Sequence, residues 1–260
     1  MANNNAMHAK PDLRVEFEPN DHFFRLGDPY RYAHLFMNTR ENMCGGTSII
    51  LSANDTLDNV PDSHKDIITP EIRLAFDDPI AYFRAVANRC RFPKMRDWLN
   101  AVTETGKWQL MLEEGFMMDR CTQGGYFLWS ESVAGAVVAP PIDLNPTHDI
   151  DAFAHYYSLV DIIHWDDFAC AGGLFGFGAP CHIVDYGIES QAKSFPSDKT
   201  FVWGNSLCGD TLVYNSDGQL GFLSHETGTA YTLGTIDEGV NWVFDELLNG
   251  RTPEFDYKMA

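Results

Sequence analysis

The stretch from residue 201 to residue 249 constrains the fold more than any other part of the chain, because it reads as short strands followed by one helix. Each strand segment is rich in β-branched and aromatic residues and is bounded by Gly, Asn, Asp or Ser. The segments are residues 200–203 (TFVW), 211–214 (TLVY), 219–223 (QLGFL) and 229–233 (TAYTL). This series predicts a sheet in the C-terminal half.

The turns between these segments predict how the strands pair. Residues 215–218 (NSDG) suit a type I turn closed by a glycine at positive φ, which joins two strands as a tight antiparallel hairpin. Residues 225–228 (HETG) offer a second turn of this kind. Thr235 and Glu238 then have the spacing of a capping box, so a helix is expected over residues 237–249, with Gly250 ending it.

Three segments in this half resemble conserved parts of a known family. They are residues 208–214 (CGDTLVY), 224–227 (SHET) and the glycine-containing residues 170–176 (CAGGLFG). The first two, followed by an amphipathic helix, resemble the C-terminal signature of the SUKH superfamily, and residues 170–176, which precede them, are similar to the helix-to-strand passage of that family; together they cover roughly residues 149–250. The resemblance implies an α+β protein-binding domain, often an immunity protein and sometimes a viral or regulatory protein, and usually no enzyme.

The rest of the chain also mixes helices and strands. Thr69-Pro70 and Asp78-Pro79 each place an N-cap residue before a proline at the first helical position, and residues 94–105 form a further helix. Strands are expected at residues 13–17, 47–51, 108–112, 125–129 and 133–138. A helix from about 150 to 170 is expected to cover the C-terminal sheet. The prediction is an α+β protein with a twisted, mainly antiparallel sheet packed against helices, SUKH-like in the C-terminal half.

Three prolines just after residue 139 suggest where the chain divides into regions. Pro140-Pro141 and Asn145-Pro146 interrupt the pattern of helices and strands. We expect a flexible tail at residues 1–12, an N-terminal α+β region at 13–140 and a SUKH-like region at 141–260. The last two can equally form one continuous domain.

Charge is the strongest global feature of the sequence. The 260 residues contain 18 Lys and Arg against 37 Asp and Glu, a net charge of −19. Residues 1–130 hold 14 basic and 18 acidic residues, a net of −4, whereas residues 131–260 hold 4 and 19, a net of −15. Such a surface repels nucleic-acid phosphate and anionic lipid and attracts a basic partner. Solubility or adaptation to salt is the alternative explanation.

Hydropathy and cysteine usage bear on the compartment. No run of about 18 apolar residues exists, and the N-terminus lacks a basic segment followed by an apolar one. The six cysteines stand singly rather than in close pairs, as reduced thiols do. We therefore expect a soluble, cytoplasmic protein that has no membrane contact.

Catalytic and metal-binding patterns are weak. His164 with Asp166 or Asp167 lacks a metal-binding spacing such as H-x-x-x-H, and residues 172–178 (GGLFGFG) lack a phosphate-binding context, so no cofactor is expected. A cysteine-dependent hydrolase would pair one of three C-terminal cysteines with a nearby histidine. These candidates are Cys170, Cys181 and Cys208, with His164, His182 or His225. Structural cysteines are the favoured interpretation.

The sequence therefore favours a non-enzymatic binding module that neutralises or recruits a basic, toxin-like partner protein. Charge steers the encounter, and a desolvated aromatic anchor adds affinity. The predicted contact residues are His164, Trp165, Asp166, Asp167, Asp210, His225 and Glu226. Two alternatives stay open: a self-assembling structural or viral protein that forms homo-oligomers, and the cysteine-dependent hydrolase.

Overall fold

The computed structural model describes most of the chain from residue 38 onward. The described residues are 38–41, 47–104, 106–114, 123–130, 132–165, 173–176, 181–186, 190, 192–205, 210–224, 226–251 and 253. The predicted tail at residues 1–12, the predicted strand at 13–17, and Asp166, Asp167 and His225 lie outside these residues.

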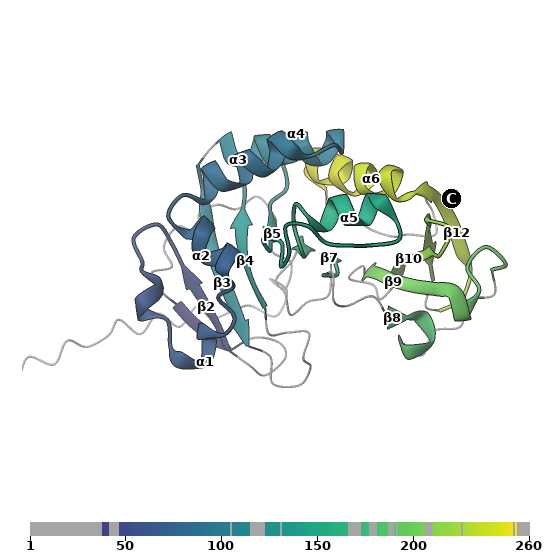
Figure 1. Ribbon diagram of the computed structural model, residues 1–260, viewed down its shortest axis with the longest axis horizontal. Helices are drawn as coiled ribbons and strands as arrows, with labels where there is room; N and C mark the ends of the chain where they lie inside the picture. The colour runs from purple at the N-terminus through teal and green to yellow at the C-terminus, as the bar shows by residue number, and fades with distance from the viewer. Residues whose placement is uncertain are drawn as a thin grey trace, which may run out of the picture.

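Runs of strands and runs of helices follow one another along this part of the chain (Figure 1). The strands are β1 (Asn38–Glu41), β2 (Thr47–Leu51), β3 (Trp108–Glu114), β4 (Gln123–Leu128), β5 (Ala136–Val138), β6 (Ile163–His164), β7 (Gly173–Leu174), β8 (Cys181–His182), β9 (Thr200–Asn205), β10 (Thr211–Asn215), β11 (Gln219–Leu223) and β12 (Ala230–Thr235). The α-helices are α1 (Asp62–Lys65), α2 (Pro70–Phe76), α3 (Pro79–Arg89), α4 (Pro93–Glu104), α5 (Asp151–Tyr157) and α6 (Ile236–Leu248). Short 3-10 helices cover Leu57–Asn59, Ile183–Tyr186 and Ser197–Lys199.

The described strands form one sheet of 12 strands, in the order β1-β2-β3-β4-β5-β6-β7-β9-β10-β11-β12, with β8 paired to β9. Every described pair is antiparallel. The α+β, antiparallel prediction is therefore confirmed. The sheet also runs across residue 140, because Val137 and Val138 of β5 pair with His164 and Ile163 of β6. The two predicted regions thus share one sheet.

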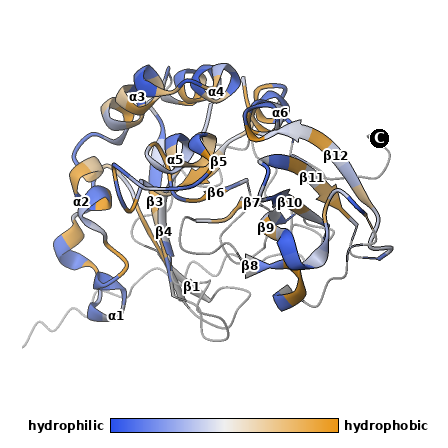
Figure 2. Ribbon diagram, turned by 45° about the vertical axis from the view of Figure 1, so that its right-hand side comes forward, coloured by the Kyte–Doolittle hydropathy of each residue, from blue (hydrophilic) through white to orange (hydrophobic). Residues whose placement is uncertain are grey.

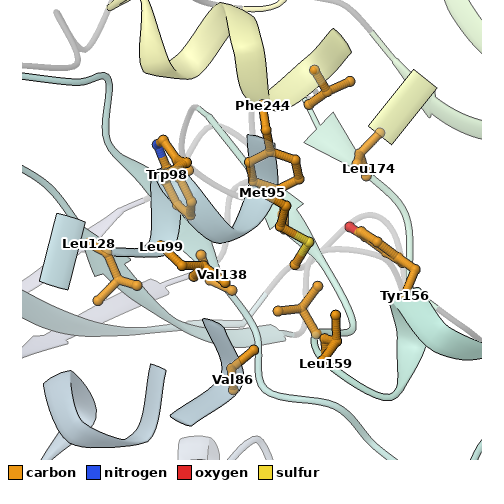
Figure 3. Packing of buried hydrophobic residues seen from close by; sticks show 14 of the residues in the cluster. Val86, Met95, Trp98, Leu99, Leu128, Val138, Tyr156, Leu159, Leu174 and Phe244 are labelled. Carbon is orange, nitrogen blue, oxygen red and sulfur yellow. The ribbon is translucent and has the colours of Figure 1, made fainter. Parts of the chain in front are cut away.

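Helices α3, α4, α5 and α6 cover one face of this sheet (Figure 1). Between the helices and the sheet lies the main apolar core, to which both halves of the chain contribute (Figure 3). The indole N–H of Trp98 in α4 donates to the carbonyl of Ala134 at 2.7 Å, and the N–H of Ala134 donates to the carbonyl of Leu247 in α6 at 2.9 Å. These two bonds link both helices to the segment that precedes β5.

The opposite face of the sheet carries two smaller apolar clusters. Successive side chains on a strand point to opposite faces of the sheet. Strand residues that neighbour a main-core residue in the sequence therefore point to the face opposite the helices. One cluster is Ile50, Met111, Phe127, Trp129 and Val137, and the other is Ile183, Phe195, Val202, Val213 and Leu223. All ten are buried, which explains why several strands read as nearly continuous apolar runs.

Local sequence signals for the C-terminal half are confirmed. The N–H of Gly218 donates to the carbonyl of Asn215 at 3.0 Å and Gly218 has φ 75°, so the first hairpin turn forms as expected. Thr235 and Glu238 form the capping box at the start of α6, and Gly250 has φ 71° just beyond the end of that helix. Thr69 and Asp78 cap α2 and α3, each followed by proline.

The predicted helix over residues 150–170 is wrong at residues 158–165, and residues 166–170 lie outside the described residues. Helix α5 ends there, and the N–H of Asp161 donates to the carbonyl of Ala139 while Ala139 donates back to Ile162. These two bonds lead directly into the pairing of β6 with β5. The β-branched residues at 160, 162 and 163 favour a strand once a neighbouring strand supplies hydrogen-bond partners. This long-range pairing replaces the expected helix at residues 161–164.

Candidate protein-interaction surface

Strand register places several predicted contact residues at one end of the sheet. His164 pairs with Gly173, which pairs with Asn205 of β9; Asn205 pairs with Thr211, and Thr211 with Leu223. The chain beyond this row includes Asp210, directly before β10, and the turn that follows β11. Residues far apart in sequence therefore approach the same end of β6, β10 and β11.

The predicted residues nevertheless do not form one compact cluster. Adjacent strands lie about 4.8 Å apart, so β6 and β10, three steps apart in the sheet, are separated by roughly 14 Å. Asp210 and the turn containing Glu226 are neighbours, because β10 and β11 pair directly. His164 and Trp165 lie apart from them.

The structure buries His164 and Trp165. Trp165 is 1% exposed and belongs to the main core beneath the helices, and His164 is 4% exposed. The His164 ring lies over Gly173, where an added Cβ would approach two ring atoms at 2.9 Å. In this fold Trp165 is a core side chain, so it does not supply the surface anchor that the sequence suggested.

The structure buries Asp210, a predicted contact residue, and leaves Glu226 exposed. Asp210 is 9% exposed, whereas Glu226 is exposed within the turn between β11 and β12. Ser224 closes that turn, because its N–H donates to the carbonyl of Thr229 and its carbonyl accepts from the N–H of Gly228. Gly228 has φ 65°, so the turn is tight and places Glu226 on the surface.

Several exposed carboxylates in the C-terminal half make no ion pair with a described residue. Within the part of the chain that the structure describes, Asp149, Asp217 and Glu226 are exposed and make no ion pair. Between Lys199 and Arg251 the sequence contains no lysine or arginine. Any cation that neutralises this segment must therefore come from another part of the chain.

Cations from the N-terminal half are used where α4 meets α5 and α6. Arg91 lies 2.5 Å from Asp151 and 3.5 Å from Asp237, and Lys94 lies 2.6 Å from Asp245. The hydrogen bond and charge of Arg91 lower the pKa of Asp151. These exposed pairs contribute modestly to stability. They do, however, neutralise part of the acidic surface on this side of the molecule.

Buried polar side chains on the face of the sheet opposite the helices have no clear sequence signal. Gln109 and Glu113 lie two positions before and two positions after Met111 in β3, so all three side chains point to the same face. Gln109 is 2% exposed and Glu113 is 0% exposed. His164 lies on the same face through its pairing with Val137. From the sequence these positions look like the solvated side of a strand, and only the fold reveals that they are buried.

The described residues offer little for catalysis or metal binding. Among them no group of three or more His, Cys, Asp or Glu side chains is arranged to hold a metal ion. Cys90 is the cysteine whose side chain is described, and burial raises its pKa to about 11. Its thiol donates to the carbonyl of Phe92 at 3.5 Å, so it is a structural group. Cys181 lies on β8, while Cys170 and Cys208 lie outside the described residues.

Comparisons with known proteins and the search for membrane spans add no identification. No protein-family model matches the chain, and neither the curated proteins nor the solved structures give a match. Over the described residues, none of the helices has the length and apolar character needed to cross a membrane.

Proposed function

We propose that the protein acts by binding, through its acidic C-terminal half, to a partner protein with a basic surface. In this proposal the C-terminal half is SUKH-like and serves as an immunity-type module that neutralises or recruits its partner. The observation that carries the proposal is the charge excess of −15 on residues 131–260, together with exposed carboxylates that have no ion pair among the described residues.

Electrostatic attraction can raise the rate of association with a basic protein by orders of magnitude. Because the Debye length is about 8 Å at physiological ionic strength, such attraction weakens as salt is added. Charge alone gives weak binding, so a second feature must hold the partner after the encounter. Because Trp165 is buried, another feature of the surface must take this role.

A selection from a random library of displayed peptides tests the proposal. Peptides that bind the full chain should be enriched in Lys and Arg over Asp and Glu, and their affinity should fall as salt rises. A matched selection on a variant carrying Asp149→Asn, Asp217→Asn and Glu226→Gln should lose part of that enrichment. Selected peptides without cationic enrichment would show that the acidic surface serves solubility.

A further inference from the structure

Strand β12 is an open edge of the sheet. It is last in the strand order, and in the described part of the chain it pairs with β11 alone. None of its six residues is buried, whereas all five of β10 are. Figures 1 and 2 both place β12 at the outer margin of the sheet. Its outward backbone N–H and C=O groups are therefore available for pairing.

The residues of this edge do little to prevent pairing. Natural edge strands are commonly protected by lysine, proline or inward-pointing charges. β12 reads AYTLGT, with neither charge nor proline, and Figure 2 colours it from near white to orange. Its register with β11 is regular from Ala230 to Thr232, and the shift in register comes only after Thr232. A regular stretch of strand thus remains to receive a partner.

Acidic side chains stand at both ends of this strand. Glu226 is exposed in the turn before β12, and Glu238 is exposed in the first turn of α6. The Glu238 carboxylate accepts the N–H of Thr235 at 2.7 Å, so it is held beside the last residue of the strand. An incoming strand would meet negative charge at each end.

We propose that the outer edge of β12 binds an extended basic segment of the partner protein as an additional strand of the sheet. The proposal rests on the proposed function and names the surface through which it works. Main-chain hydrogen bonds supply the affinity of this mode of recognition, and alternate side chains supply its specificity. Lys or Arg near the ends of the segment would face Glu226 and Glu238.

Side chains of β12 indicate which residues the segment carries. Tyr231 and Leu233 are half-buried and pack against the main core, and the Tyr231 ring stacks on Phe222 with centroids 5.9 Å apart. An added strand would cover their exposed parts with its own side chains. The fitting segment therefore has apolar residues at alternate positions, flanked by basic ones.

A second copy of this chain is a poorer occupant of the edge. Antiparallel pairing of β12 with itself would bring Glu226 of one copy toward Glu238 of the other at both ends. Like charges placed opposite each other destabilise strand pairs. The same carboxylates that attract a basic segment thus oppose self-association.

The test uses a fluorescent cationic peptide of about eight residues, a typical strand length, from the selection described above. Its affinity is measured by fluorescence anisotropy for the full chain and for two variants at exposed Thr232. Thr232→Lys should weaken binding by about tenfold or more, because it adds the charge with which natural edges block pairing. Thr232→Glu, at the same position, should bind as the parent does or more tightly.

Three further measurements separate strand addition from general attraction. A peptide N-methylated at alternate residues keeps its charge but loses hydrogen-bond donors, so it should bind at least about tenfold more weakly. Asp217→Asn removes one exposed charge from the β10–β11 turn, away from the edge, and should weaken binding less than Glu226→Gln. Hydrogen exchange should slow in β12 when peptide is added.

The outcomes distinguish the two proposals. If cationic peptides bind but neither N-methylation nor Thr232→Lys matters, the edge proposal is wrong and the basic-partner proposal survives. If the selection yields no cationic peptides, the basic-partner proposal fails, and the edge proposal fails with it. Sedimentation that reveals a dimer dissociated by Thr232→Lys would assign the edge to a second copy and overturn the proposed occupant.

Discussion

The backbone N–H of Arg91 donates a hydrogen bond to Nε2 of His155 across 3.1 Å, although 64 positions separate the two residues in the sequence. The bond joins the α3–α4 connection to α5, and Arg91 also pairs there with Asp151 and Asp237. Only an unprotonated ring nitrogen can accept this bond. Burial, and secondly the charge of Arg91, lower the pKa of His155, while Asp151 and Asp237 act in the opposite direction.

This arrangement predicts that mild acid destabilises the protein. The unfolded chain protonates His155 near pH 6.5, whereas the folded ring resists protonation, so the unfolded state binds more protons. The free energy of unfolding should therefore fall as pH drops from about 7.5 to 5.5, which urea titrations can measure. His155→Gln keeps an acceptor that does not titrate and should flatten this dependence. An equally steep dependence in that variant would contradict the prediction.

The capping box should account for a measurable part of the stability of α6. The N–H of Glu238 donates to the Thr235 hydroxyl at 3.4 Å, and the Glu238 carboxylate accepts the Thr235 N–H at 2.7 Å. Thr235→Ala is expected to lower the free energy of unfolding by about 1 kcal/mol. Thr232→Ala, on the exposed edge nearby, should change it by less than about 0.5 kcal/mol. Urea denaturation of the two variants gives the comparison.

The contribution of this cap should also depend on pH, in a lower range than that of His155. Hydrogen bonds from Thr235 lower the pKa of Glu238 below its ordinary value of 4.5. The stabilisation is therefore present above pH 4.5 and is lost as pH falls through the folded-state pKa. The difference between the parent and Glu238→Ala, which removes the carboxylate that accepts the Thr235 N–H, should shrink in that range. A constant difference would show that the carboxylate does not take part.

The sequence predicted an element well where the interactions that form it join residues close together in the chain, and poorly where they join distant segments. The capping box and the Asn215–Gly218 turn depend on residues within four positions of one another, so the sequence was sufficient for them. The strand β6 depends on β5, more than 20 positions earlier, and helix periodicity masked it. The sequence also could not show that β12 ends the sheet, since strand order is set by pairing across the whole chain.

Two strand glycines, Gly173 in β7 and Gly124 in β4, should differ in their tolerance of a side chain. A Cβ on Gly173 would lie 2.4 Å from the carbonyl oxygen of Ile163, a backbone atom fixed by strand pairing. A Cβ on Gly124 would instead meet the side-chain ends of Ile72 and Leu112 at 2.9 Å, which can rotate. Gly173→Ala should cost about 3 kcal/mol or more and Gly124→Ala about 1 kcal/mol. Similar unfolding free energies for the two would contradict the difference.

Replacing Trp165 should lower the stability of the fold more than it lowers the affinity for the peptide. Its side chain is 1% exposed in the main core, so Trp165→Ala is expected to lower the free energy of unfolding by about 3–5 kcal/mol. Trp165→Phe keeps most of the apolar volume and should cost less. Thermal unfolding of both variants, compared with peptide binding at a temperature where both are folded, separates the two effects. If Trp165→Ala folds as stably as the parent yet loses binding, the side chain contacts the partner directly, and the β12 edge is then not its only point of attachment.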